Sequence, residues 1–149
     1  DGAPPKNVFP PFTTLKSVLP AFGFFSSSKY FMGSRDWYDY AFFNTIPENE
    51  KRQAFEKFAV PESYKVSREL VLNSFSNIDF GKPHNPILFI GGGSDTIFPS
   101  SLTTTLARKY KDRNSRVDLK IFQGKSHFIC GEPGWEAVAD YILDWYEKL

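Results

Sequence analysis

The sequence predicts a mixed α/β fold in which two parallel strands with flanking helices follow a helical region. After residue 86, apolar runs typical of strands alternate with helical patterns, which is the order of a parallel α/β unit. Residues 34–75 carry helical patterns instead, and the composition changes near residue 80. We therefore expect two regions, a helical cap over residues 1–80 and an α/β core over residues 81–149.

The first 33 residues combine several prolines with many phenylalanines. Proline restricts the backbone and lacks an amide donor, so we expect irregular loop with at most short helices. A solvated linker would not carry so many aromatic rings, and the segment is therefore predicted to pack on another surface. The rings belong to Phe9, Phe12, Phe22, Phe24, Phe25 and Phe31.

Helices are predicted from residue 34 onward. The letters TIPE at positions 45–48 form the pattern of a capping box. In such a box the Thr45 hydroxyl accepts a hydrogen bond from the Glu48 amide, and the Glu48 carboxylate reaches back. The helix is expected to extend to about residue 58, and a second one to occupy about 61–75. A further candidate helix covers residues 34–43.

Two short strands are predicted in the second region. The run PILFI at 86–90 is apolar throughout, as in a strand that is buried on both faces of a parallel sheet. The glycines at 91–93 are expected to end it. The run VDLKIF at 117–122 predicts the second strand, and the turn residues of SNIDFGKPHN at 76–85 predict a loop.

Two helices accompany these strands. Ser100 or Ser101 is expected to cap a helix that lies between the strands in the chain. A terminal helix is expected to begin at Pro133, because apolar residues recur after it at the spacing of an amphipathic face. Those residues are Trp135, Val138, Ala139, Ile142, Trp145, Tyr146 and Leu149.

Two chemically capable residues follow the predicted strands. Asp95 comes after the first strand and His127 after the second. Functional groups in parallel sheets sit past the carboxyl ends of strands, so the two side chains would meet at one edge and hydrogen-bond. The carboxylate would fix the imidazole tautomer and leave the other ring nitrogen as a general base. Alone, each residue has a structural alternative: an Asx turn or helix cap for Asp95, and a packed loop position for His127.

These segments resemble a known family. PILFIGGGSDTIFP, residues 86–99, resembles the strand and turn that carry the catalytic acid in α/β-hydrolases. FQGKSHFICGEPGWEAVADYILDWYEKL, residues 122–149, resembles the family's end, where the histidine follows the last strand. The order of acid and then histidine also agrees. The resemblance implies Asp95 as the acid and His127 as the base, and residues 34–80 look like the family's helical cap.

The family's nucleophile motif is missing from the sequence. G-x-S-x-G occurs nowhere, and the nearest match, residues 92–96, has Thr96 in place of the last glycine. An elbow nucleophile leads directly from strand into helix, whereas four residues separate Asp95 from the predicted helix, so Ser94 is a poorer fit to the elbow than to the acid turn. Two strands are also too few for an open sheet. We therefore expect a C-terminal half whose companion, a separate chain or segment, supplies the nucleophile.

The leading hypothesis is a Ser-His-Asp hydrolase that acts on a small, mostly apolar ester. Phe98 and Phe128 are the candidates for substrate contact. Two alternatives stay open: an epoxide hydrolase or dehalogenase with an Asp nucleophile outside this chain, and a non-catalytic domain that binds a small molecule or protein on the same fold.

Composition bounds these hypotheses. The 149 residues carry a net charge of +1, which disfavours nucleic acid as a partner. Two His and one Cys in no ligand spacing disfavour a metal site, and no cofactor is expected. No apolar run is long enough to span a membrane. No signal peptide is visible and the lone Cys favours a reducing compartment such as the cytoplasm, while the missing initiator Met indicates processing or a longer parent chain.

Three further residues are assigned structural roles. Cys130 is expected to be buried filler, and His84 an exposed loop residue. Glu132, just ahead of the terminal helix, is expected to cap that helix.

Overall fold

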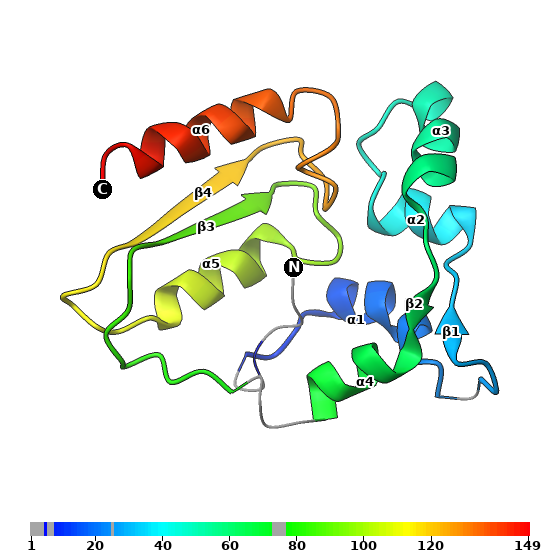
Figure 1. Ribbon diagram of the computed structural model, residues 1–149, viewed down its shortest axis with the longest axis horizontal. Helices are drawn as coiled ribbons and strands as arrows, with labels where there is room; N and C mark the ends of the chain where they lie inside the picture. The colour runs from blue at the N-terminus through cyan, green and yellow to red at the C-terminus, as the bar shows by residue number, and fades with distance from the viewer. Residues whose placement is uncertain (1–4, 6–7, 25, 73–76) are drawn as a thin grey trace.

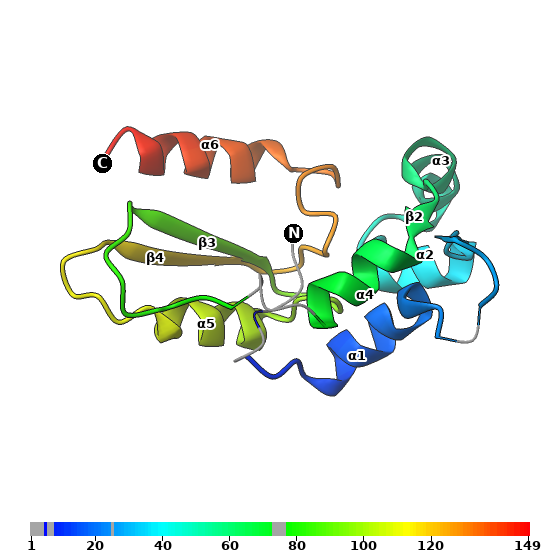
Figure 2. The ribbon, with the colours of Figure 1, turned by 60° about the horizontal axis from the view of Figure 1, so that its bottom comes forward.

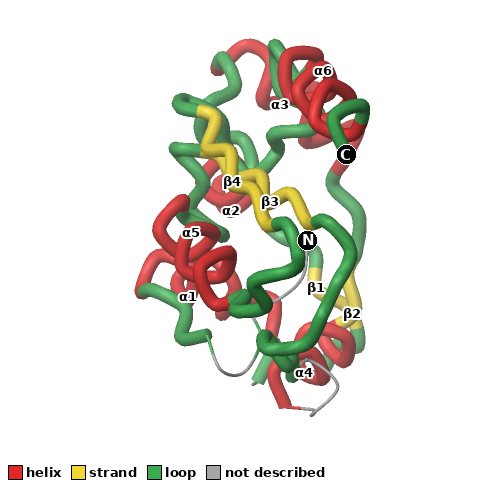
Figure 3. Tube along the Cα trace, turned by 90° about the vertical axis from the view of Figure 1, so that its left-hand side faces the viewer, coloured by secondary structure: helices red, strands yellow, loops and turns green. Residues whose placement is uncertain are grey.

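The computed structural model describes residues 5, 8–24, 26–72 and 77–149. The predicted α/β unit is present: β3 (Ile87–Gly92) and β4 (Val117–Phe122) pair in parallel, with Ile87 opposite Val117 and Gly92 opposite Phe122. Helix α5 (Ser100–Lys109) connects the two strands and lies on one face of the sheet, while α6 (Glu136–Tyr146) lies on the other (Figure 2). Figure 3 shows the strands side by side between these helices.

Two of the three glycines after the first apolar run belong to the strand, which ends at Gly92 and not before Gly91. Gly91 and Gly92 are buried and pair with Ile121 and Phe122. A Cβ atom at Gly92 would lie 2.4 Å from the carbonyl oxygen of Lys125. The glycine therefore allows the end of β3 and the loop after β4 to approach each other closely.

The region ahead of the sheet is mostly helical, as expected (Figure 1). Two-residue strands β1 and β2 also pair there in antiparallel fashion, with Tyr30 opposite Ser63. Two residues are too few to show a strand period, so the sequence pattern could not reveal them. The elements are α1 (Phe12–Val18), the 3₁₀ helix η1 (Leu19–Phe22), β1 (Tyr30–Phe31), α2 (Arg35–Ala41), α3 (Glu48–Phe58), β2 (Glu62–Ser63) and α4 (Tyr64–Leu72).

The capping predictions were wrong at two helices. At α3 the N-cap position is occupied by Pro47 without a side-chain hydrogen bond, and the Thr45 hydroxyl donates to the Glu132 carboxylate instead. At α5 the N-cap residue is Pro99, so neither predicted serine caps the helix. The cap that is formed is at α2, where the Ser34 hydroxyl accepts from the Trp37 amide at 3.2 Å.

Two helices begin later than expected. Helix α4 begins at Tyr64 because Glu62–Ser63 pairs with β1. Its expected end near Phe75 lies outside the described residues. Helix α6 begins at Glu136, three residues after Pro133.

A core of Tyr38, Phe43 and Ile46 holds the helical region together. Phe128 from the loop after β4 packs against this core, so the two regions share it. Burial raises the pKa of the Tyr38 phenol above its ordinary value. The division of the chain at residue 80 stays a prediction.

The N-terminal phenylalanines are only partly covered. Phe31 packs as predicted, with its ring 5.1 Å from Trp37 and 5.8 Å from Tyr64. For Phe9, Phe12 and Phe24 the prediction was wrong, since they are 90%, 78% and 62% exposed. The rings of Phe22 and Phe24 stack on each other at 5.5 Å, and Phe25 lies outside the described residues.

Helix α6 is fixed to β4 by side-chain contacts. The Tyr141 ring lies 5.7 Å from the Phe122 ring, and the Trp145 indole donates to Asp118 at 2.6 Å. The indole hydrogen bond, helped by Arg116, holds the pKa of the Asp118 carboxyl below its ordinary value. In the part of the chain that the structure describes, no helix is long and apolar enough to cross a membrane.

Candidate functional site

The loops that follow β3 and β4 meet at one edge of the sheet. The strands are parallel, so their carboxyl ends open on the same side. We call residues 93–98 the acid turn and residues 123–132 the base loop. The Gly93 amide donates to the Phe122 carbonyl at 2.8 Å, and the Ser94 amide donates to the Lys125 carbonyl at 2.9 Å. These backbone contacts hold the two loops together.

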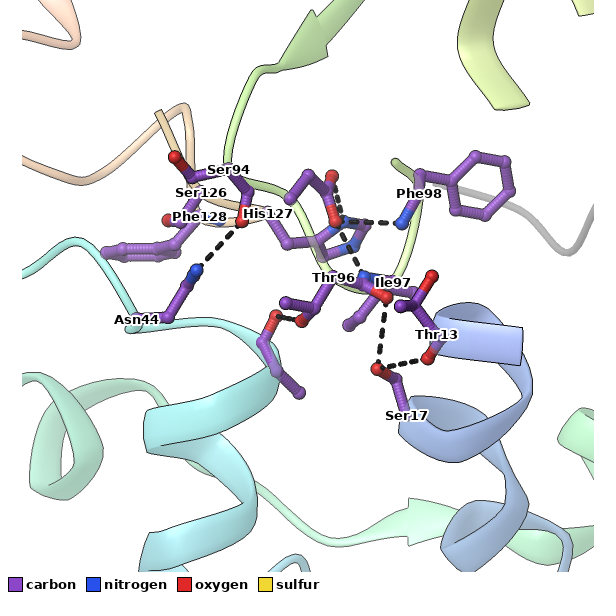
Figure 4. A network of polar contacts seen from close by, with 12 residues as sticks. Thr13, Ser17, Asn44, Ser94, Thr96, Ile97, Phe98, Ser126, His127 and Phe128 are labelled. Atoms are coloured by element: carbon purple, nitrogen blue, oxygen red, sulfur yellow. Dashed lines mark hydrogen bonds and ion pairs between the residues drawn. The ribbon is translucent and has the colours of Figure 1, made fainter. Parts of the chain in front are cut away.

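Asp95 and His127 form the hydrogen bond expected from the sequence. The Asp95 Oδ2 atom lies 2.8 Å from Nδ1 of His127, and their side chains are only 6% and 10% exposed. The other carboxylate oxygen accepts from the amides of Ile97 and Phe98, each at 2.8 Å (Figure 4). Asp95 thus forms the turn that was its structural alternative and contacts the histidine at the same time.

This geometry defines the chemistry of the imidazole. An ionised carboxylate only accepts hydrogen bonds, so it selects the tautomer in which Nδ1 carries the proton. The lone pair is then on Nε2, at the opposite corner of the ring. Burial of both side chains strengthens the contact, because water competes weakly for it. The pair can therefore accept a proton at Nε2 and stabilise the resulting imidazolium.

Aromatic rings surround His127. The Phe42 ring meets the imidazole edge-on at 5.2 Å, and the Phe98 ring lies nearly parallel to it at 6.4 Å. Phe128, the other candidate for substrate contact, packs against Phe43 at 5.4 Å and Phe58 at 5.0 Å. The structure thus brings Phe98 to the histidine and places Phe128 beside the helical core.

The helical region holds the acid turn through contacts that the sequence did not reveal. The Ser17 hydroxyl donates to the Thr96 carbonyl at 3.1 Å, and the Thr96 hydroxyl to the Tyr40 carbonyl at 3.0 Å. The Asn44 amide donates to the Ser94 carbonyl at 2.8 Å (Figure 4). These partners are 50 or more residues apart in the chain, and no local pattern connects them.

Glu132 is the site residue whose role was misassigned. Trp135 rather than Glu132 occupies the N-cap position of α6. Glu132 is 2% exposed and accepts hydrogen bonds from Ser126 and Thr45. Its position five residues after His127 was visible in the sequence, but the direction of its side chain was not.

Two other structural assignments were wrong. Cys130 is exposed rather than buried. His84 is half-buried instead of exposed, because its ring lies against Tyr110 at 5.0 Å and its Nδ1 atom contacts the Asn85 carbonyl. Both residues lie in loops, where the burial of a side chain depends on which residues the tertiary fold places next to it.

Ser94 does not have the setting of an elbow nucleophile. An elbow leads from strand into helix through a strained turn. Here α5 begins six residues after Ser94, at Ser100. Among the described residues, no residue other than glycine has a positive φ.

A depression of about 640 Å³ is lined by residues of α1, of η1 and of the segment that follows η1. None of its lining residues belongs to the acid turn or the base loop, and we do not assign it to the reaction. The lining residues are Phe12, Lys16, Leu19, Pro20, Gly23, Phe24 and Ser26.

Within the described residues, no three His, Cys, Asp or Glu side chains are grouped to hold a metal ion.

The fold is similar to that of a solved hydrolase. The crystal structure of Paleococcus ferrophilus monoacylglycerol lipase, an α/β-hydrolase, matches with a TM-score of 0.55 and 17% sequence identity over 95% of this chain. The match covers 53% of the lipase, so the chain spans about half of that protein's length. No family model and no curated protein matches the sequence. The likeness shows a mixed α/β fold that is similar in structure to this α/β-hydrolase.

Proposed function

We propose that this chain supplies the acid and the base of a Ser-His-Asp hydrolase, with Asp95 orienting His127. The observation that carries the proposal is the 2.8 Å contact between these two buried side chains at the carboxyl edge of a parallel strand pair. The similarity of the fold to a lipase supports a hydrolase. The order of the two residues along the chain also supports it, since the acid comes before the histidine.

In the proposed reaction, a serine outside this sequence attacks the carbonyl carbon of an ester. His127 takes the serine proton at Nε2, and the Asp95 carboxylate stabilises the imidazolium. The tetrahedral intermediate collapses, the bond to the alcohol breaks, and His127 returns the proton to the departing alkoxide. Water then attacks the acyl-enzyme with His127 again as the base, which releases the acid and restores the serine. Such proton transfer contributes about 10²–10⁴-fold to the rate.

The nucleophile is proposed to come from a companion segment or chain. All 149 residues lack G-x-S-x-G. Within the described residues, β3 pairs with β4 alone, which leaves its second edge available to another strand. Sheets usually have about four to six strands, so a companion would extend this one at an open edge. The lipase, roughly twice as long as the matched region, supports the same view.

The substrate is proposed to be a small, mostly apolar ester. The rings of Phe42 and Phe98 flank the imidazole and offer apolar surface to an acyl or alkyl group. The matched enzyme is named a monoacylglycerol lipase, and that name fits an ester with an apolar chain. Phe98 is therefore the better candidate for substrate contact, while Phe128 supports the helical core.

The test is replacement of the base in the complete protein, meaning this chain together with the nucleophile-bearing part. His127→Ala should lower hydrolysis of p-nitrophenyl butyrate by about 10³-fold or more. His84→Ala is the matched control, because His84 precedes β3 and lies at the other end of the sheet. Unchanged turnover by the His127 variant would contradict the hydrolase role and favour a non-catalytic binding domain.

The isolated chain tests the companion. The 149-residue protein should give only background hydrolysis of the same ester, because its sequence lacks the G-x-S-x-G nucleophile motif. Turnover that disappears in a Ser94→Ala variant would overturn this part of the proposal and make the chain a complete enzyme.

A further inference from the structure

The carboxylate of Glu132 lies in the base loop but takes no part in the proposed proton transfer. It is 2% exposed, which is rare for a glutamate because a buried charge is costly unless hydrogen bonds replace its water. The residue has no cap function at α6. The hydrogen bonds of its carboxylate must therefore account for its burial.

Those contacts hold the backbone on both sides of His127. The Ser126 amide donates to Oε1 of Glu132 at 2.9 Å. The Ser126 hydroxyl donates to Oε2 at 3.1 Å and accepts from the Phe128 amide at 3.1 Å. One carboxylate, directly and through one hydroxyl, thus fixes the amides that flank the histidine.

A third donor connects Glu132 to the helical region. The Thr45 hydroxyl, between α2 and α3, donates to the same Oε2 atom. All three direct partners of Glu132 are donors, as an ionised carboxylate requires. The base loop is thereby attached to the segment that also carries Asn44, a partner of the acid turn.

We propose that Glu132 is a positioning residue for His127. It holds the base loop so that Nδ1 of His127 reaches Asp95, without touching the imidazole itself. The catalytic meaning of this role rests on the proposed function, but the positioning is a property of this chain alone. When the carboxylate is removed, the flanking amides lose their acceptor and the imidazole loses its fixed approach to Asp95.

The chain is well suited to a direct test, because it contains only two histidines. In ¹⁵N-histidine-labelled protein, the imidazole nitrogen shifts report the tautomer of each ring. Wild-type His127 should show the tautomer protonated at Nδ1, and His84 serves as an internal reference at the far end of the sheet. Glu132→Ala should shift the His127 nitrogens toward a mixture of tautomers and leave those of His84 unchanged.

Graded variants keep the test valid if the alanine variant fails to fold. Glu132→Gln retains one acceptor oxygen but turns an amide donor toward the hydroxyl groups, so its effect on His127 should be smaller than that of alanine. Ser126→Ala removes the link to the Phe128 amide and should act in the same direction. Glu136→Gln, at an exposed position in the first turn of α6, is the matched control and should change neither ring.

The outcomes separate positioning from mere stabilisation. A purely structural role would lower the melting temperature of Glu132→Gln while the His127 shifts in the folded protein stayed at their wild-type values, and that result would overturn the proposal. In the complete protein, Glu132→Gln should lower kcat about tenfold with little change in KM. If His127→Ala leaves turnover unchanged while Glu132→Gln still moves the His127 shifts, the hydrolase function fails and the positioning role stands.

Discussion

The acid turn and the base loop present their side chains to each other but are held in different ways. The acid turn is held by its own carboxylate and by distant helices, through Ser17 in α1 and Asn44 after α2. The base loop is held from within by Glu132, five residues beyond the histidine, and from the helical region by the Thr45 hydroxyl and by the packing of Phe128 on the helical core. The acid turn thus has hydrogen bonds to the helical region through Ser17 and Asn44, whereas the base loop combines an internal carboxylate with apolar packing on the helical core.

This difference teaches that the two halves of a candidate catalytic pair can be held by contacts of different kinds. Loss of the Ser17 or Asn44 hydrogen bond should therefore disturb the acid turn first. Changes inside residues 123–132 should disturb the base loop first.

The largest effect is expected from Asp95→Asn. The remaining oxygen still accepts from the Ile97 and Phe98 amides, so the turn should persist. The new amide group donates toward His127, which forces the ring proton from Nδ1 to Nε2 and removes the base. Turnover by the complete protein should fall about 10³–10⁴-fold, measured with p-nitrophenyl butyrate.

Asp79→Asn is the control for that substitution, because Asp79 accepts from the Gly81 amide in a similar but exposed turn. Its turnover should equal that of the wild type. Wild-type turnover in the Asp95 variant would show that the turn, rather than the carboxylate charge, is what matters at position 95.

The next largest effect is expected from Gly92→Ala, where the two loops touch. The new Cβ atom would lie 2.4 Å and 2.5 Å from the carbonyl oxygens of Lys125 and Ser126, and backbone atoms must move to admit it. Overpacking of this kind costs about 1–3 kcal/mol. Urea unfolding should show that loss, and the His127 nitrogen shifts should change with it.

Gly81→Ala is the matched control for this strain, since the nearest atom to its Cβ would be Asp79 Oδ1 at an ordinary 3.5 Å. Equal stability of the two variants would mean that the base loop moves to admit the new Cβ atom at no cost in unfolding free energy, so the close approach at Gly92 would not constrain that loop.

A smaller effect is expected from Ser17→Ala, which removes the hydroxyl that connects α1 to the acid turn. The variant should lose about 1 kcal/mol in urea unfolding, the usual contribution of one hydrogen bond. Thr105→Ala is the control, because the Thr105 hydroxyl donates to the Ser101 carbonyl on an exposed part of α5. If the two variants lose the same amount, the connection to the helical region does not stabilise the acid turn.

The smallest effect is expected at the far end of the sheet, from Trp145→Phe. The indole hydrogen bond lowers the pKa of Asp118, so its stabilisation is present above the ordinary carboxyl pKa and is lost as the pH falls through the lowered value. At neutral pH, loss of this hydrogen bond should lower the free energy of unfolding by less than about 1 kcal/mol, because Asp118 is partly exposed.

Urea unfolding at pH 7 and below about pH 3 measures this difference. The gap between wild type and variant should narrow at the lower pH, leaving only the lost packing of the larger ring. His127 shifts should stay unchanged, and a change in them would indicate that the two ends of the sheet are coupled.

The α/β unit was predictable because its patterns are local. The run VDLKIF at 117–122 coincides with β4, and α5 lies between the strands in the chain as predicted, although neither predicted serine caps it. Asp95 and His127 were predictable as neighbours for a topological reason: parallel strands bring their carboxyl ends to one edge, whichever side chains surround them. The catalytic roles of both residues stay predictions.

The errors arose where a residue's partner is distant in the chain. Thr45 and Glu48 form a plausible capping box, yet the Thr45 hydroxyl is bonded to Glu132, 87 residues away. Phe9 and Phe12 were expected to be covered because they are aromatic, but both are exposed. The local sequence does not specify which other residues would cover their rings.

The sequence by itself determined the strand–helix alternation and the placement of an acid and a histidine after consecutive strands, because both follow from hydrophobic period and chain order. Only the tertiary structure decided which groups hold those two residues in place. Ser17, Asn44 and Thr45 reach the loops only after the helical region has folded against the sheet. A hydrogen bond depends on the distance and direction of two groups, and the chain order of distant residues specifies neither.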